Sequence, residues 1–255
     1  MCYDDNARPP LPPIAGGAAD GKDLTLTAAD GNRFMAYEAR AGQSKGAGII
    51  IYPDVRGLHQ FYKDLALRFA EVGISAVAMD FFGRTAGLSA RDDAFEFRSH
   101  VQQMTLPSFF NDMRAAQEHL HTIIGTTSPT FAVGFCMGGN LSLYTSLEGL
   151  NLSGVIAFYA GMGRAWDEQH GKFPEAGARC KAPVLGLFGG ADPSIPNEQV
   201  HQLDQALDGS GVKHDIHIYD GAPHSFFDRR YAEWAEACDD AWKRMLNFIA
   251  NHSTK

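Results

Sequence analysis

The sequence predicts an α/β fold in which a mainly parallel central sheet carries helices on both faces. Six short apolar runs recur along the chain, each bounded by turn residues, and helix-like stretches separate them. A length of 255 residues is enough for a sizeable core in one such domain. The six runs, expected to be strands, are GAGIIIYP, GISAVAMD, TFAVGF, GVIAFYA, PVLGLFG and HDIHIY.

An N-terminal hairpin is expected before the parallel strands. The prolines from Pro9 to Pro13 predict an extended lead-in over residues 1–20. The stretch LTLTAADGNRFMAYEAR then predicts two strands around the turn Asp30-Gly31. Because no repeat or linker is evident, we expect residues 1–255 to form a single domain.

Two amphipathic helices are predicted from apolar residues at helical spacing. We expect their aromatic residues to pack in the core rather than to bind a cofactor, and Cys238 to be a small buried hydrophobe. One stripe contains Phe109, Met113, Ala116, Leu120 and Ile123, and the other contains Tyr231, Trp234, Cys238, Ala241, Met245 and Phe248.

Composition limits the classes of partner. A net charge of -8 argues against a nucleic-acid or anionic-membrane surface, so we expect a small-molecule partner. The four cysteines are widely separated and form no CxxC pair, which favours a reducing compartment. The N-terminal residues lack the features of a signal peptide, and no apolar run approaches the ~18 residues of a membrane span. We therefore expect a cytoplasmic protein, and because no HExxH motif or Cys/His cluster is present, we expect no metal and no cofactor.

The stretch GFCMGGN, residues 134–140, has the shape of a nucleophile elbow with cysteine at its centre. A strand that enters a helix through Gly-x-Cys-x-Gly turns sharply and leaves little room for side chains, which favours glycine. The turn would place Cys136 above the carboxyl edge of the sheet, near a helix N-terminus that stabilises a thiolate. The Met137 N–H would then face a developing oxyanion. Taken alone, Cys136 could equally be a packing residue in a tight turn.

Two later residues favour catalysis at Cys136. Asp192 follows the run PVLGLFG, and His224 follows the last predicted strand. Nucleophile, acid and histidine in this order are typical of α/β-hydrolase triads, so we expect that fold. His224 would move the proton, and Asp192 would orient the imidazole. In isolation, Asp192 could cap a helix that begins near Pro196, and His224 could be an ordinary loop histidine.

At this point the sequence resembles the dienelactone hydrolase family, whose best-known members open an enol lactone to maleylacetate. The resemblance covers most of the chain and implies a triad of Cys136, Asp192 and His224. It rests on IIIYPDVRGLHQFYKDLALRFAEVGISAVAMDFFGR, GFCMGGN, GGADPSIP and YDGAPHSFFD.

The resemblance also implies roles for residues that follow the strand GAGIIIYP. Asp54 matches an acidic residue that holds the resting thiol in the family, although aspartate is one methylene shorter than the glutamate expected there. The Val55 N–H would be the second oxyanion donor. Asp54 could instead be a cap or turn residue.

For substrate binding, the resemblance implies two arginines that hold a carboxylate. Arg84 matches the first, but Asp228 occupies the position of the second, and Arg229 follows it. Phe82 and Tyr159 are candidates to line an apolar pocket above the sheet. The alternative for each arginine is a surface residue, and for each aromatic it is core packing.

The sequence therefore predicts a hydrolase that opens a lactone or activated ester by attack of Cys136. The alternative is a redox-sensing or ligand-binding protein on the same fold, because an accessible thiolate is easily oxidised. Sensing would require neither Asp192 nor His224, and no resolving cysteine is evident in the sequence.

Overall fold

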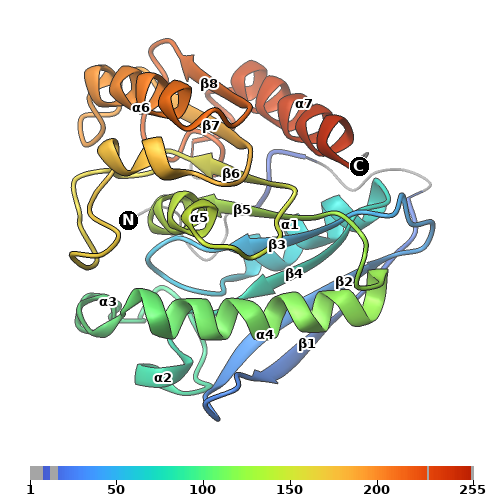
Figure 1. Ribbon diagram of the computed structural model, residues 1–255. Helices are drawn as coiled ribbons and strands as arrows, with labels where there is room; N and C mark the ends of the chain where they lie inside the picture. Colours follow the sequence, from blue (N-terminus) through green and yellow to red (C-terminus); the bar gives the residue numbers. More distant parts are fainter. Residues whose placement is uncertain (1–7, 12–16, 229, 254–255) are drawn as a thin grey trace.

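In the computed structural model, which describes residues 8–11, 17–228 and 230–253, eight strands form one sheet (Figure 1). Their order is β1-β2-β4-β3-β5-β6-β7-β8. The strands from β4 to β8 in this order are parallel, whereas β1 and β2 pair antiparallel at one edge. This is the mainly parallel sheet that the sequence predicts.

Each of the six apolar runs forms a strand, as predicted. Every residue of the five strands from β3 to β7 is buried, which explains why these runs are continuously apolar rather than alternating. The six strands are β3 (Gly48–Tyr52), β4 (Ser75–Met79), β5 (Thr130–Phe135), β6 (Gly154–Phe158), β7 (Val184–Gly189) and β8 (His214–Tyr219).

The predicted N-terminal hairpin is confirmed. Strands β1 (Ala19–Thr27) and β2 (Arg33–Ala41) pair over their whole length. Gly31 lies in the turn at a φ of 85°, a conformation that favours glycine. Because β1 begins at Ala19, the strand overlaps the predicted lead-in of residues 1–20, of which residues 1–7 and 12–16 lie outside the described residues.

Helices cover both faces of the sheet (Figure 1). On one face, α1 (Gln60–Glu71) and α7 (Ala235–His252) meet through Phe69 and Trp242, whose ring centroids are 4.9 Å apart. The other face carries α4 (Leu106–Ile124), α5 (Met137–Leu147) and α6 (Asn197–Ser210). The short helices are α2 (Gly83–Ala86), α3 (Arg98–Gln103) and the 3-10 helix η1 (Glu175–Arg179). None of the helices within the described residues is long and apolar enough to cross a membrane.

The two predicted amphipathic helices correspond to α4 and α7. In α4, the residues of the predicted stripe are buried, apart from the partly buried Ile123. In α7, the prediction is wrong at its start, because the helix begins at Ala235 and leaves Tyr231 and Trp234 outside it. The Trp234 N–H donates to the Tyr231 carbonyl at 3.1 Å, so this stretch forms a turn. Cys238 is 1% exposed, which confirms its prediction as a buried residue.

Strands β5, β7 and β8 deliver their following residues to the same edge of the sheet. They are connected by parallel pairing through β6, in which Phe135 lies opposite Phe158, and Phe158 lies opposite Leu187. Leu187 in turn lies opposite His217 of β8. The loops that carry the three predicted catalytic residues therefore all leave from the carboxyl edge.

Candidate active site

Cys136 lies at a sharp turn between β5 and α5. Its φ of 56° and ψ of -112° are unusual for a residue with a side chain and cost on the order of 1–3 kcal/mol. Two hydrogen bonds hold this backbone. The Cys136 N–H donates to the Phe158 carbonyl at 3.1 Å, and the Asn140 N–H donates to the Cys136 carbonyl at 3.0 Å.

The glycines on either side of Cys136 are required by close backbone contacts. A Cβ atom on Gly134 would lie 1.9 Å from the Gly138 carbonyl oxygen. A Cβ atom on Gly138 would lie 2.2 Å from the carbonyl oxygen of Pro53, just after β3. The glycine pattern thus encodes a tight elbow whose helix start packs against the end of β3.

Cys136 differs from the other two cysteines of the described chain in its exposure. Cys136 is partly exposed, whereas Cys180 and Cys238 are buried. Burial raises the pKa of the Cys180 thiol to about 11 and that of the Cys238 thiol to about 12. Neither buried thiol is suited to act as a nucleophile near neutral pH.

His224 and Asp192 are in direct contact. His224 Nδ1 lies 2.5 Å from Asp192 Oδ2, and the Asp192 side chain is 1% exposed. Asp192 Oδ1 accepts hydrogen bonds from the Ser194 N–H at 2.9 Å and the Ser194 hydroxyl at 2.6 Å. Burial favours the neutral acid, but the hydrogen bonds from His224 and Ser194 outweigh it and lower the pKa of Asp192 from its ordinary value.

The Asp192 contact has a consequence for the tautomer of His224. Because an ionised carboxylate only accepts hydrogen bonds, Nδ1 must carry the proton, which leaves Nε2 as the basic nitrogen of a neutral ring. The alternative in which Asp192 caps a helix is not observed, since α6 has Pro196 at its N-cap and no side-chain cap.

The segment after β6 connects the elbow with His224. Its Phe158 carbonyl accepts the Cys136 N–H, and the Tyr159 ring centroid is 4.9 Å from that of His224. The Tyr159 ring also contacts Phe135, the residue before Cys136, at 6.2 Å. The structure thus brings Asp192 and His224 together beside a segment that is bonded to the backbone of Cys136.

Two backbone amides adjoin the elbow. The Val55 N–H and the Met137 N–H make no hydrogen bond to another described residue. Their chain segments meet where Gly138 packs against the carbonyl of Pro53. Met137 is the first residue of α5, and an amide in that position is suited to stabilise negative charge.

Asp54 is fully buried beside these amides. Its Oδ1 accepts the Arg56 N–H at 2.8 Å, and its own N–H donates to the Tyr62 hydroxyl oxygen at 3.0 Å. The Gly57 N–H also donates to the Asp54 carbonyl. These are contacts of a turn residue, which was the alternative for Asp54, and its role in holding the thiol stays a prediction.

Comparison with known proteins decides the family. The sequence model of the "Dienelactone hydrolase family" matches residues 34–253. The chain belongs to the dienelactone hydrolase family. It is therefore a hydrolase that acts on ester bonds.

Relatives within the family match most of the chain. The carboxymethylenebutenolidase of Rhodococcus opacus is 27% identical over 266 aligned residues, which cover 100% of this chain and 98% of that protein. A Yersinia pestis protein assigned as a carboxymethylenebutenolidase is 27% identical over 233 residues, which cover 89% of this chain and 87% of that protein. A Klebsiella pneumoniae structure assigned as a dienelactone hydrolase superposes with a TM-score of 0.78 at 23% identity, over 91% of this chain and 99% of its own. That last similarity is one of fold.

The family resemblance predicts that Arg84 binds a carboxylate of the substrate. In the structure, Arg84 binds two carboxylates of this chain. Its Nη2 donates to Asp112 Oδ1 at 2.8 Å, and its Nη1 lies 2.7 Å from Asp30 Oδ2. Its Nε also donates to Asp112 at 3.2 Å. These ion pairs join α2, α4 and the hairpin turn, so they give Arg84 a structural role and leave its substrate role a prediction.

The remaining substrate-binding candidates are placed differently from one another. Phe82 is fully buried and packs against the rings of Phe81 and Phe95, which is the core packing considered as its alternative. Tyr159 is also fully buried but lies against His224. Arg229 lies outside the described residues.

Asp228 has a contact that the sequence did not predict. It is fully buried, and its Oδ2 accepts a hydrogen bond from the Tyr159 hydroxyl at 2.8 Å. The only sequence signal was an aspartate at a position where the family resemblance implies an arginine. The carboxylate in this place accepts a hydrogen bond from a buried hydroxyl.

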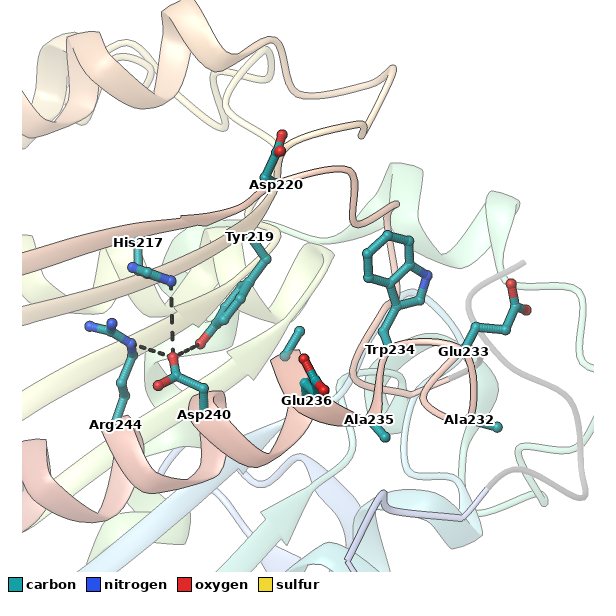
Figure 2. Close-up of a pocket in the computed structure, with 11 residues that line it drawn as sticks. His217, Tyr219, Asp220, Ala232, Glu233, Trp234, Ala235, Glu236, Asp240 and Arg244 are labelled. Carbon is teal, nitrogen blue, oxygen red and sulfur yellow. Dashed lines mark hydrogen bonds and ion pairs between the residues drawn. The ribbon is translucent and has the colours of Figure 1, made fainter.

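A cavity of about 650 Å³ lies elsewhere, between β8 and the start of α7 (Figure 2). None of the three predicted catalytic residues lines it. On its wall, Asp240 Oδ2 accepts hydrogen bonds from the Tyr219 hydroxyl at 2.9 Å and from Arg244 Nε at 2.6 Å. Within the described residues, no group of three or more His, Cys, Asp or Glu side chains is arranged to hold a metal ion.

Proposed function

We propose that the protein hydrolyses a lactone or another activated ester through a covalent acyl-enzyme on Cys136, with His224 and Asp192 completing the triad. The observation that carries the proposal is the contact of 2.5 Å between His224 Nδ1 and Asp192 Oδ2, at the sheet edge from which the strained Cys136 turn projects. A histidine oriented by a carboxylate, at the sheet edge that also carries a cysteine elbow, supports an arrangement of the kind that nucleophilic acyl transfer needs.

In the first half of the reaction, the sulfur of Cys136 attacks the acyl carbon, and its proton goes to Nε2 of His224. The tetrahedral oxyanion is stabilised by the N–H groups of Val55 and Met137, which have no other described acceptor. The C–O bond of the ester then breaks, and His224 returns its proton to the leaving oxygen. A thioester of Cys136 remains.

In the second half, His224 removes a proton from water, which attacks the thioester. The Cys136 thiolate leaves and recovers its proton from His224. In a lactone the leaving oxygen stays attached to the acyl group, so the product departs as one hydroxy or keto acid. A thiolate reacts readily with activated acyl groups, which favours activated esters and lactones over amides as the substrate class.

A carboxylate clamp by Arg84 is not part of this proposal, because that guanidinium is held by Asp30 and Asp112. Arg56 is likewise paired, with Asp93. We therefore keep the substrate class at lactones and activated esters, without requiring a carboxylate on the substrate.

The redox-sensing alternative has less support. Cys180 and Cys238 are buried, and their raised thiol pKa makes both poor partners for resolving an oxidised Cys136. Redox sensing by Cys136 would also not require the contact between His224 and Asp192. Conversion of Cys136 to a mixed disulfide without any ester turnover would favour the alternative.

The test is turnover of p-nitrophenyl acetate by the wild-type protein and by Cys136→Ala and His224→Ala. We expect both variants to lose at least about a hundredfold in kcat/KM while their far-UV circular dichroism stays unchanged. Turnover in both variants equal to that of the wild type would remove the proposal. A screen of lactones, aryl esters and thioesters would then identify the acyl group that the site prefers.

A further inference from the structure

We propose that Tyr159 and Asp228 form a positioning pair that holds the imidazole of His224 in its reactive orientation. The inference rests on the proposed function. The Tyr159 hydroxyl donates to Asp228 Oδ2 at 2.8 Å, and both side chains are fully buried. The Tyr159 ring lies 4.9 Å from the His224 ring, at an interplanar angle of 56°.

The backbone of Tyr159 is held in an unusual conformation. Its φ of 34° is rare for a bulky residue and costs on the order of 1–3 kcal/mol. The Tyr159 N–H donates to the Leu187 carbonyl of β7 at 2.8 Å. The strained backbone and the hydroxyl bond together fix both ends of the Tyr159 side chain, and this directs its ring against His224.

Asp228 belongs to the same loop as His224, four residues further on. The Asp228 N–H donates to the Ser225 carbonyl at 3.3 Å, and Ser225 has a φ of 60°. This compact turn makes Asp228 a rigid extension of the loop that carries His224. A hydrogen bond to Asp228 therefore restrains the position of His224 as well.

The pair also connects His224 with the nucleophile. Phe158, which precedes Tyr159, accepts the hydrogen bond of the Cys136 N–H. The end of β6 is thus bonded to the elbow through Phe158 and to the histidine loop through Tyr159. The end of β6 therefore restrains the positions of both reacting residues, Cys136 and His224.

Tyr159 adds a restraint on the imidazole of His224 to the one that Asp192 gives. Asp192 accepts a hydrogen bond from Nδ1 of His224, which sets the tautomer and anchors that edge of the ring. The Tyr159 ring, whose centroid is 4.9 Å from that of the imidazole at an interplanar angle of 56°, packs beside the imidazole and limits its movement. A misplacement on the order of 1 Å can cost up to about a hundredfold in rate, so this restraint matters for kcat.

The key variant is Tyr159→Phe, which removes the hydroxyl and keeps the ring. The matched control is Tyr219→Phe, because Tyr219 is also buried and donates to a carboxylate, that of Asp240, at 2.9 Å (Figure 2). If Tyr159 acts by positioning, Tyr159→Phe lowers kcat for p-nitrophenyl acetate roughly tenfold and leaves KM within about twofold. Tyr219→Phe leaves both constants within about twofold of the wild type.

A second readout does not depend on ester turnover. The alkylation rate of Cys136 by iodoacetamide is followed from pH 5 to 9 by mass spectrometry of its peptide. We expect Tyr159→Phe and His224→Ala to slow alkylation at pH 6, because the proposed function makes His224 the base that takes the proton of the Cys136 thiol. Tyr219→Phe should match the wild type. A general loosening of the fold would instead raise the alkylation rate of Cys136, which is the opposite of the decrease expected from lost positioning.

A third variant tests whether the two residues act as a unit. We expect Asp228→Ala to lower kcat as Tyr159→Phe does, and the double variant to be no slower than either single one. The proposal is overturned if Tyr159→Phe alkylates and turns over like the wild type, or if Tyr219→Phe loses as much kcat. Failure of the proposed function is a separate result, seen as equal turnover by wild type and Cys136→Ala. In that case the alkylation rates of Cys136 still decide the role of Tyr159.

Discussion

His224 and Asp192 are 32 residues apart in the sequence, yet His224 Nδ1 lies 2.5 Å from Asp192 Oδ2. This contact joins the loop that follows β7 to the loop that follows β8. Because the Asp192 side chain is 1% exposed, its charge depends on the hydrogen bonds from His224 and Ser194. The same pair therefore bears on both stability and chemistry.

Asp192→Asn tests the stability of this pair through its pH dependence. The pKa of Asp192 is lowered from its ordinary value of 3.8, since the bonds from His224 and Ser194 outweigh the effect of burial. Its contribution to stability is therefore present above about pH 4 and is lost as the pH falls through the folded-state pKa. We expect Asp192→Asn to lower the free energy of unfolding by about 2 kcal/mol at pH 7 and by less at pH 3, which lies below the ordinary pKa of the group. Urea unfolding at both pH values checks this, and an equal loss at both would contradict it.

Thiol labelling tests the difference between the cysteines. With thiol pKa values raised to about 11 and about 12, Cys180 and Cys238 are ionised to only about one part in a thousand and one in ten thousand at pH 8. We expect iodoacetamide to modify Cys136 before either of them in the native protein. Peptide mass mapping over time gives the order. Modification of Cys180 or Cys238 as fast as Cys136 would show that the elbow thiol has no special access.

Gly138→Ala tests the packing of the elbow. The added Cβ would lie 2.2 Å from the Pro53 carbonyl oxygen, and neither backbone can yield easily. We expect a loss of about 3 kcal/mol in the free energy of unfolding, with lost turnover. The control is Gly149→Ala, where nothing lies within 4 Å of the new Cβ, and its change should stay within about 0.5 kcal/mol. Equal stability of the two variants, measured by urea unfolding, would mean that the elbow is not tightly packed.

Arg84→Ala separates the structural role of Arg84 from the substrate role that the family resemblance implies. The buried Asp112 carboxylate would lose its guanidinium partner, so we expect a loss of about 2 kcal/mol in stability at pH 7. The exposed Arg33 provides a control, and Arg33→Ala should change stability by less than about 0.5 kcal/mol. We expect KM for carboxylated lactones to stay within about twofold in Arg84→Ala. A tenfold rise in KM with unchanged stability would instead restore Arg84 as the carboxylate ligand.

Much of the fold was predictable because burial imposes simple patterns. Strands covered on both faces must be apolar throughout, so β3 to β7 stand out as short apolar runs, and the glycines of the elbow mark a turn without room for side chains. The start of α7 was not predictable in this way. Tyr231 and Trp234 have helical spacing, but they lie in a turn from which their side chains pack partly buried against the core. Spacing alone does not distinguish such a turn from a helix.

In the candidate site, chain order predicts that Asp192 and His224 come together, but it does not predict the side chains that surround them. The position of Asp192 after β7 and of His224 after β8 follows from the parallel sheet, and their contact is of the kind that this order predicts. The ion pairs of Arg84 with Asp30 and Asp112 depend on segments far apart in the sequence. The same holds for the bond between Tyr159 and Asp228, which are 69 residues apart. No local pattern encodes such pairings.

The central claim is that the sulfur of Cys136 carries the acyl group. The most direct measurement is rapid acid quenching of the protein during turnover of p-nitrophenyl acetate, followed by mass spectrometry of its peptides. We expect one acetyl group, on the peptide that contains Cys136, with no such adduct in Cys136→Ala and accumulation of the adduct in His224→Ala under excess substrate. Steady turnover in which the acetyl group appears on another residue, or in which Cys136→Ala works as fast as the wild type, would contradict the account.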